Sequence, residues 1–194
     1  MKLFKLTASA CLCFTLFMGL SSCEKDEEKD KVNLYVKTDI PGSGAQIAPT
    51  PSPSAGTAKL SVDYDKRTRI LNYAITWSGL TDSVIAIRIN GPAPVGYSAF
   101  RTPFNVAAGD SSSFNTTPYI VLQQATGSSP RAMAGASGSY TGTLTVDDLK
   151  VKEQDLLNQY YYVTLHTKTI LPVPGAARFL FRWFGEVRAQ IVFQ

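Results

Sequence analysis

The chain has 194 residues, a formal net charge of +4 and a hydrophobic content of 44%. This length suits one domain with a full core after a short N-terminal extension. The charge falls to +2 without Lys2 and Lys5 and forms no basic patch, which argues against a nucleic-acid partner. A single histidine is too few for a His-rich metal site.

The first segment, residues 1–22, has the organisation of a signal peptide. Two lysines precede an apolar run from Leu6 to Leu20, which is shorter than the roughly 20 residues that span a bilayer core. The run ends in Leu20-Ser21-Ser22-Cys23, which resembles the lipobox of bacterial lipoproteins. That resemblance implies cleavage before Cys23 and attachment of lipid to its sulfur, which would anchor the mature chain to a membrane. The alternative is an ordinary secretory signal in which Cys23 has no role.

The second segment, residues 23–31, is expected to be a flexible tether. Cys23 is followed by eight charged residues, five acidic and three basic, which cannot bury apolar surface. Within it, Lys25-Asp26-Glu27-Glu28 resembles the surface-export signal of lipoproteins of the Bacteroidetes, which implies an outer-membrane protein exposed at the cell surface. A periplasm-facing anchor is the alternative. Cys11 and Cys13 lie in the signal peptide, so the folded part has no cysteine for a disulfide or a zinc site.

The remaining residues, 32–194, are expected to form one all-β domain. Short alternating or β-branched segments separated by turn residues predict strands at 32–37, 58–63, 70–77, 84–89, 119–122, 140–146, 160–166 and 186–193. The second and third should pair as a hairpin around Asp65-Lys66. Strands at this spacing predict a single antiparallel β-sandwich or a barrel-like, immunoglobulin-like domain.

Periodicity also predicts which side chains share a face. Alternation places Ile85, Ile87 and Ile89 on one face of their strand, and it turns four residues of the last strand toward the core, namely Val187, Ala189, Ile191 and Phe193. Residues 147–158 carry the one helical signal, of one or two turns. The segments 107–118 and 125–139 are rich in small polar residues and are expected to be connecting loops.

No catalytic or cofactor motif accompanies these strands. The chain has no G-x-S-x-G elbow, P-loop or G-x-G-x-x-G segment, and His166 is its one histidine. The prediction is therefore no cofactor, no metal ion and no catalytic residue. Asp63 and Asp65 could share a strand face and hold calcium weakly, but a hairpin turn is the preferred explanation for them.

Several motifs in order resemble the CHRD domain, a family named from chordin that also occurs in bacterial secreted proteins. Tyr161–Thr167 and Gly185–Ile191 resemble its C-terminal signature, approximately Tyr-Val-Asn-Val-His-Thr followed by Gly-Glu-Ile-Arg-Gly-Gln. Three upstream segments also fit, at Ser54–Ala58, Leu71–Leu80 and Ile89–Ala93. The resemblance covers about residues 40–193 and implies a non-enzymatic binding or structural module.

The chain departs from that family at two places. Where the family typically has His-Ile-His-Gly-Pro, this chain has Arg88-Ile89-Asn90-Gly91-Pro92, and the permanent cation of Arg88 disfavours a metal ion there. The loop between Thr167 and Gly185 is longer than usual and contains the aromatic run Phe179–Phe184. That run is either an extra strand on the core or an exposed patch that binds a protein or glycan partner.

These motifs predict a polar cluster, made of Arg88, Asn90, His166, Glu186 and Arg188. Glu186 and Arg188 share a strand face and could form an ion pair. The favoured interpretation is a polar network that fixes strand register, and the alternative is a remnant ligand site. At the level of function, the expectation is a lipid-anchored, non-catalytic binding or structural module with an unknown partner. The alternative is a hydrolase-like enzyme that uses His166 and Glu186.

Overall fold

The computed structural model describes residues 33–48, 50–98, 121–127, 135–169, 171 and 184–193, and nearly all of its regular structure is β. The strands are β1 Leu34–Ser43, β2 Thr57–Asp65, β3 Ile70–Ser78, β4 Val84–Asn90, β5 Val121–Thr126, β6 Gly138–Thr145, β7 Tyr162–Thr167 and β8 Val187–Gln190. A 3-10 turn, η1 Gly44–Gln46, follows β1, and the short helix α1 Glu153–Leu157 precedes β7.

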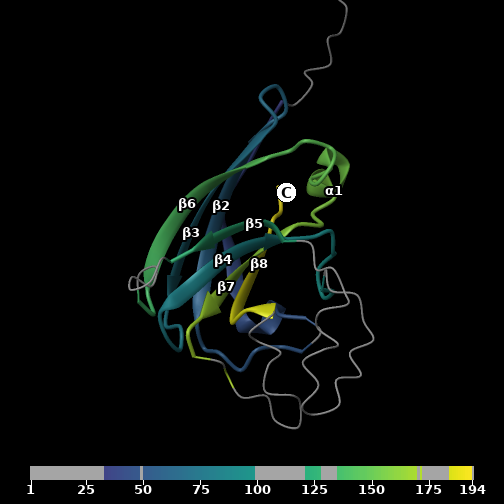
Figure 1. Cartoon of the computed structure of the whole chain (residues 1–194). Coiled ribbons are helices and arrows are strands. Elements are labelled where there is room, and N and C mark those ends of the chain that lie inside the picture. The colour runs from purple at the N-terminus through teal and green to yellow at the C-terminus, as the bar shows by residue number, and fades with distance from the viewer. Residues whose placement is uncertain are drawn as a thin grey trace, which may run out of the picture. The chain divides into compact units, whose positions relative to one another are not determined.

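All eight strands belong to one sheet, in the order β5-β4-β7-β8-β1-β2-β3-β6. Every neighbouring pair is antiparallel. The sheet curls so that its two halves enclose a core, and β5 and β6 are its edge strands (Figure 1). The prediction of an all-β antiparallel domain is confirmed, in a barrel-like form with all described strands in a single sheet.

The β2–β3 hairpin shows most directly how the sequence forms this sheet. Every second residue of both strands is buried, as expected when one face of a pleated strand covers a core. The strands pair without a shift from Thr57 opposite Ser78 to Asp65 opposite Ile70. At the turn, the Asp65 carboxylate accepts a hydrogen bond of 2.8 Å from the backbone N–H of Arg67. The turn explanation for Asp65 is therefore confirmed.

The core lies between the two halves of the curled sheet. Fully buried residues such as Leu60, Leu71 and Ile87 come from both halves, and each contributes about 1.5–3 kcal/mol relative to an exposed side chain. The helix predicted within 147–158 is confirmed as the single turn α1, which adds the buried Leu156. Val187, Ala189 and Ile191 face this core as predicted, and Phe193 packs against it partly buried.

The prediction for Ile85 is wrong. Its side chain is 42% exposed, whereas Ile87 and Ile89 are buried. The pairing of β4 with β7 shifts between Val84 and Ala86, which is the signature of a β-bulge. One extra residue reverses the alternation, so Val84 enters the core in place of Ile85.

Two strands are longer than their sequence signals. β1 continues through Pro41 and Gly42 to Ser43, although the alternating pattern ends at Lys37. Gly42 permits this because a Cβ there would lie 2.9 Å from the Cβ of Ala189. β5 runs to Thr126, into a segment expected to be a loop, because its backbone pairs with β4. Tertiary pairing here overrides weak local propensity.

Candidate functional site

The register of β4, β7 and β8 brings the predicted polar residues to one face of the sheet. Thr164 of β7 lies opposite Arg88 of β4 on one side and opposite Arg188 of β8 on the other. Asn90 lies opposite Tyr162. The residues that alternate with them on these strands fill the apolar core, so the polar residues lie on the opposite face of the sheet. Most of its polar side chains are buried; we call these the polar layer: Asn90, Thr164, His166, Glu186, Arg188 and Gln190.

The first part of the polar layer is a chain of side-chain hydrogen bonds. Asn90 Nδ2 donates to Thr164 Oγ1 at 2.9 Å, and the same hydroxyl is 3.0 Å from His166 Nε2. All three residues are buried, His166 with 3% exposure. A buried polar group needs such partners, because leaving it unsatisfied costs about 1–3 kcal/mol. Thr164 thus links β4 to the single histidine of the chain.

The second part is centred on the carboxylate of Glu186, which is 2% exposed. Its Oε1 accepts hydrogen bonds from Ser54 Oγ at 2.6 Å, Thr81 N at 2.7 Å and Thr81 Oγ1 at 2.9 Å. Its Oε2 accepts one from Thr167 Oγ1 at 2.5 Å. These donors come from three segments that are distant in sequence. Glu186 therefore ties the end of β7 to the chain before β2 and the chain before β4.

The backbone at Gly185 makes this position of Glu186 possible. Gly185 has a φ of +87°, and a Cβ at this residue would lie 2.8 Å from the carbonyl oxygen of Leu165. Only glycine accommodates both conditions without strain. The Gly-Glu pair found in the sequence is thus explained by a close approach of the chain to β7.

The third part is the guanidinium of Arg188, which is 2% exposed. It donates to the carbonyl oxygens of Tyr97 at 2.5 Å and Pro94 at 3.2 Å, and its Cζ lies 3.7 Å from the centroid of the Tyr162 ring. Burial lowers the pKa of Arg188, and the neighbouring Tyr162 opposes that change. Gln190 accepts from Arg188 and donates to three backbone carbonyls. Together they fasten the segment after β4 to β8.

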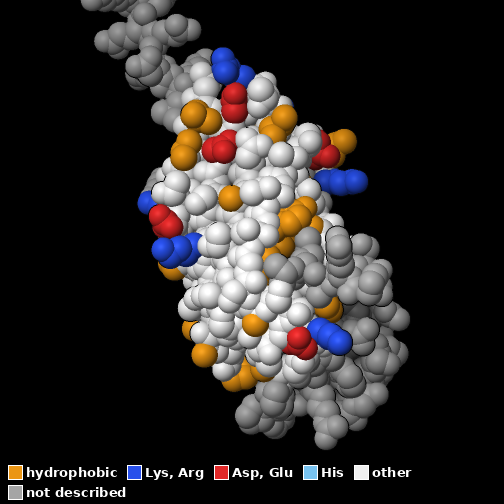
Figure 2. All heavy atoms as spheres, turned by 90° about the vertical axis from the view of Figure 1, so that its left-hand side faces the viewer, with side chains coloured by type: hydrophobic (Ala, Val, Ile, Leu, Met, Phe, Trp, Pro, Cys, Tyr) orange, Lys and Arg blue, Asp and Glu red, His pale blue; other side chains and the backbone are white. Residues whose placement is uncertain are grey.

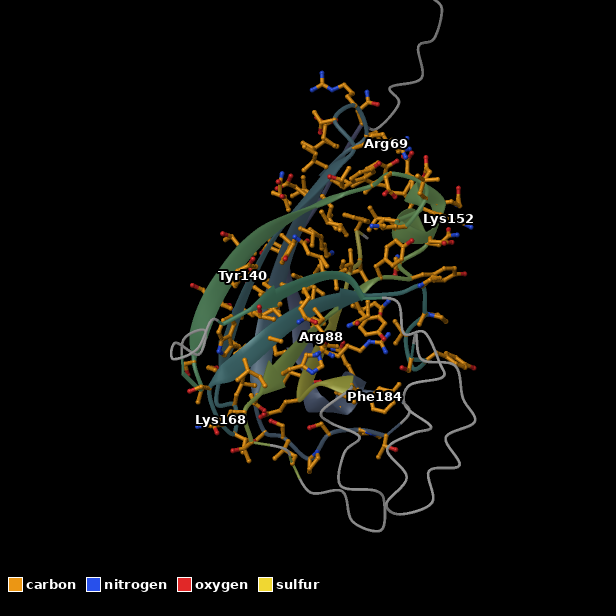
Figure 3. All side chains as sticks on the ribbon, viewed as in Figure 1. Arg69, Arg88, Tyr140, Lys152, Lys168 and Phe184 are labelled. Carbon is orange, nitrogen blue, oxygen red and sulfur yellow. The ribbon has the colours of Figure 1, made fainter. Side chains whose placement is uncertain are left out.

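The ion pair that Glu186 and Arg188 could form is not present. Glu186 is occupied by hydroxyl and backbone donors, and Arg188 by carbonyl oxygens and an aromatic ring. The described salt bridges lie elsewhere, on the surface, as between Arg69 and Asp148; Arg69 is labelled in Figure 3. The structure thus brings Asn90 and His166 together through Thr164, places Arg88 in register beside them, and holds Glu186 and Arg188 in separate sets of bonds.

Sequence reasoning missed several members of these sets. Thr164 and Gln190 were detectable, because each lies two residues from a nominated residue on the same strand face. Ser54 and Thr81 had no such signal, since they lie 132 and 105 residues from Glu186 in the chain. Their role depends entirely on the folded arrangement.

The chemistry available at the polar layer is limited. Within the described ranges, no three His, Cys, Asp or Glu side chains are grouped to hold a metal ion. Cys23, the charged tether and residues 179–183 of the aromatic run lie outside the described residues, and Phe184 at its end is buried. No helix in the described part of the chain is both apolar enough and long enough to cross a membrane.

Comparison with known proteins agrees with the motif order. The family model described as CHRD domain matches residues 39–170. The match includes β2, β3, β4 and β7, whereas Gly185 to Gln190 lies beyond it and is joined to the domain by the pairing of β7 with β8. Searches among curated proteins and among solved structures find no match. Because the family model covers more than half of the sequence, the chain belongs to the CHRD domain family.

Proposed function

We propose that this protein is a bacterial lipoprotein of the Bacteroidetes type, anchored in the outer membrane through Cys23, with its CHRD domain as a non-catalytic binding or structural module. The proposal that the domain is non-catalytic is supported above all by the hydrogen bonds of Glu186. A carboxylate with 2% exposure that accepts four hydrogen bonds from the protein has its acceptor sites filled by the fold.

The hydrolase-like alternative needs a different arrangement of the same residues. A general base must lie within hydrogen-bond reach of a substrate group or a nucleophile in an accessible site. His166 and Glu186 are both buried and share no described partner, because His166 bonds Thr164 and Glu186 bonds Ser54, Thr81 and Thr167. No described feature favours catalysis, so the polar layer is best explained as a structural element that fixes the register of β4, β7 and β8.

The anchoring part rests on the sequence before the domain. The lipobox-like Leu20-Ser21-Ser22-Cys23 and the acidic tether support lipidation and export to the cell surface. Lipidation through two or more acyl chains holds a protein stably on a bilayer, whereas a single chain does so only marginally. The tether then separates the domain from the membrane surface.

The anchor is tested by replacing Cys23 with Ser in cells fed labelled palmitate. The wild-type protein should carry label and sediment with the outer membrane, and Cys23→Ser should lose the label and leave the membrane fraction. Protease added to intact cells should digest the wild-type domain if it faces outward. Unchanged labelling and sedimentation of the variant would overturn the anchor, and protection from protease would assign the domain to the periplasmic side.

A further inference from the structure

The strongest unexplained feature is the end of the domain at which the chain enters it. The described residues begin at Asn33, whose carbonyl oxygen accepts a hydrogen bond of 2.8 Å from the backbone N–H of Lys66 in the β2–β3 turn. The loop after β6 lies beside the same turn, because the backbone N–H of Val146 donates to the carbonyl oxygen of Arg69 at 2.9 Å. We call the start of β1, this turn and residues 146–152 the entry end of the domain.

Exposed aliphatic side chains gather at the entry end. Seven large hydrophobic side chains are exposed among the described residues, and four of them lie here, namely Leu34, Val36, Ile70 and Leu149. Leu34 and Ile70 stand on either side of Asp65 in one row of the outer sheet face, since both are its register partners. Single exposed hydrophobic residues are ordinary, but a group of them indicates an interaction surface.

Leu149 is the most exposed of the four, at 86%, although its loop is held by hydrogen bonds. The Asp147 Oδ1 atom accepts from three backbone N–H groups of the loop, including that of Leu149 at 3.0 Å. The backbone N–H of Asp148 closes the loop by donating to the carbonyl oxygen of Val151 at 2.9 Å. A well-bonded loop thus keeps a leucine in solvent, where its apolar surface gains nothing from burial.

The charged side chains of the entry end are largely paired with one another. Each of its described salt bridges joins a basic residue of the turn to a nearby carboxylate: Lys66 to Glu153, Arg67 to Asp65 and Arg69 to Asp148. Figure 2 shows hydrophobic, acidic and basic side chains close together at the upper end of the molecule. Such a surface does not select a strongly charged partner. Aliphatic groups beside long basic side chains suit a bilayer interface, where the charged heads reach the headgroups.

The proposed lipid anchor limits how far this end can be from a membrane. Cys23 precedes Asn33 by ten residues, so a fully extended chain between them would span at most about 35 Å. The entry end therefore stays within that distance of the bilayer. A short linker of this kind gives an effective concentration in about the millimolar range, so a weak contact is enough to be populated.

We propose that the entry end docks on the lipid bilayer, with Leu34, Ile70 and Leu149 in the interfacial region and the paired charges among the headgroups. This inference rests on the proposed anchor at Cys23 and adds a docking surface to it. The contact is apolar in origin, so it should not require anionic lipid. Side chains in such a contact lie roughly 5–10 Å into the boundary between headgroups and acyl chains.

The test uses the lipidated full-length protein in vesicles of phosphatidylethanolamine and phosphatidylglycerol. Loss of the signal peptide and lipidation of Cys23 would leave no free thiol, so Leu149→Cys creates a single site for a nitrobenzoxadiazole probe. Lipids that carry a nitroxide near the headgroup should quench this probe at least about threefold more than the same probe at Ile85→Cys, because only an interfacial side chain lies within the bilayer boundary.

Ile85 is the matched control position. Its side chain is also aliphatic and 42% exposed, but it belongs to the opposite end of the domain. Ser83, two residues before it, accepts a backbone hydrogen bond from Lys168, which lies at the end opposite Arg69 in Figure 3. A probe there should report the same vesicles without entering them.

A second pair of variants tests the surface itself, with the probe kept at Leu149→Cys. Leu34→Asp should reduce the quenching by about half, since a charge in the interfacial region opposes insertion, and Ile85→Asp should leave it unchanged. Melting temperatures of the variants check that the fold is retained. The quenching should persist in about 0.5 M salt, which screens ionic attraction but not apolar contact.

Three results would overturn the docking while leaving the anchor intact. They are equal quenching at the two probe positions in vesicle-bound protein, quenching that Leu34→Asp leaves unchanged, and quenching that disappears in salt. Protein that fails to float with the vesicles would overturn the anchor and the docking together, so the two failures are distinguishable.

Discussion

The sharpest prediction concerns the replacement of Glu186 by alanine. The substitution removes an acceptor of four hydrogen bonds and leaves the Thr81 N–H and three hydroxyl groups without it. The donors belong to residues that are less buried than Glu186, namely Ser54, Thr81 and Thr167, so water can replace some of the lost hydrogen bonds. We therefore expect the free energy of unfolding to fall by about 3 kcal/mol, which is less than four full bonds to a charged group.

The conservative variant Glu186→Gln separates charge from shape. Its amide oxygen can keep the three bonds at Oε1, and its amide nitrogen can donate to Thr167 Oγ1, whose own hydrogen already has a second acceptor in the Thr169 carbonyl at 3.1 Å. Only the charge-assisted part of the bonding is then lost. The free energy of unfolding should therefore decrease by about 1 kcal/mol, one third of the decrease expected for Glu186→Ala.

Urea and thermal unfolding by circular dichroism measure both variants, with Glu153→Ala as the control. Glu153 forms a surface pair with Lys66 at 3.5 Å, so its removal should cost less than about 1 kcal/mol. For a domain of this size, about 3 kcal/mol corresponds to a decrease in melting temperature of roughly 6–12 °C.

An unchanged or raised melting temperature for Glu186→Ala would refute this reasoning. It would mean that desolvation of the buried carboxylate costs more than its hydrogen bonds return. Residues held at a cost in stability are typical of active sites, so the enzyme alternative would regain support.

Three further predictions test individual contacts of the fold. Tyr64→Phe should raise the free energy of unfolding by about 1 kcal/mol in urea unfolding, since the buried Tyr64 hydroxyl has no partner among the described residues. Tyr161→Phe should lower it by a similar amount, because it removes the acceptor of the partly buried hydrogen bond from the backbone N–H of Lys152. Gly185→Ala should lower the free energy of unfolding by about 2 kcal/mol or more, because it adds a steric clash to backbone strain. Gly96→Ala, at a φ of +81° in open space, should lower it by only about 1 kcal/mol. Equal losses for the two variants would contradict the close approach of Gly185 to β7. Hydrogen bonds from backbone N–H groups, that of Val151 first, lower the pKa of Asp147 in the folded protein. The ionised carboxylate therefore stabilises the fold at pH values above the pKa of Asp147 in the unfolded chain. This contribution is lost as the pH falls through the lower pKa of the folded state. Asp147→Ala should therefore reduce the melting temperature at pH 7 and much less at pH 2, and a pH-independent difference would argue against this cause.

Local sequence signals identified most of the strands. Where alternation continues without interruption, as from Ala58 to Tyr64, the strand, its buried face and its hairpin partner were all predictable. This works because the two-residue period of a strand is a local property of the chain. It fails at Ile85, where a β-bulge set by pairing with β7 reverses the faces.

The candidate site was also only partly predictable from the sequence. The positions of Arg88, Asn90, His166 and Arg188 on neighbouring strands were predictable from motif order and strand alternation, and Glu186 lies directly before the last of these strands. Their bonding partners were not predictable, and the ion pair that Glu186 and Arg188 could have formed is absent among the described salt bridges. A side chain bonds whichever groups the fold brings within about 3 Å, and those groups can be far away in the sequence.

Composition and local period therefore predicted a cysteine-free, all-β domain, and the order of its motifs indicated the CHRD family, because these properties can be read from residue type and spacing. Only the tertiary structure decided that Glu186 bonds Ser54 and Thr81, that Arg188 holds the segment after β4, and that exposed aliphatic side chains of β1, β3 and the loop after β6 gather at the entry end. The physical reason is that hydrogen-bond partners and the neighbours of a surface side chain depend on the register between strands, which long-range pairing sets.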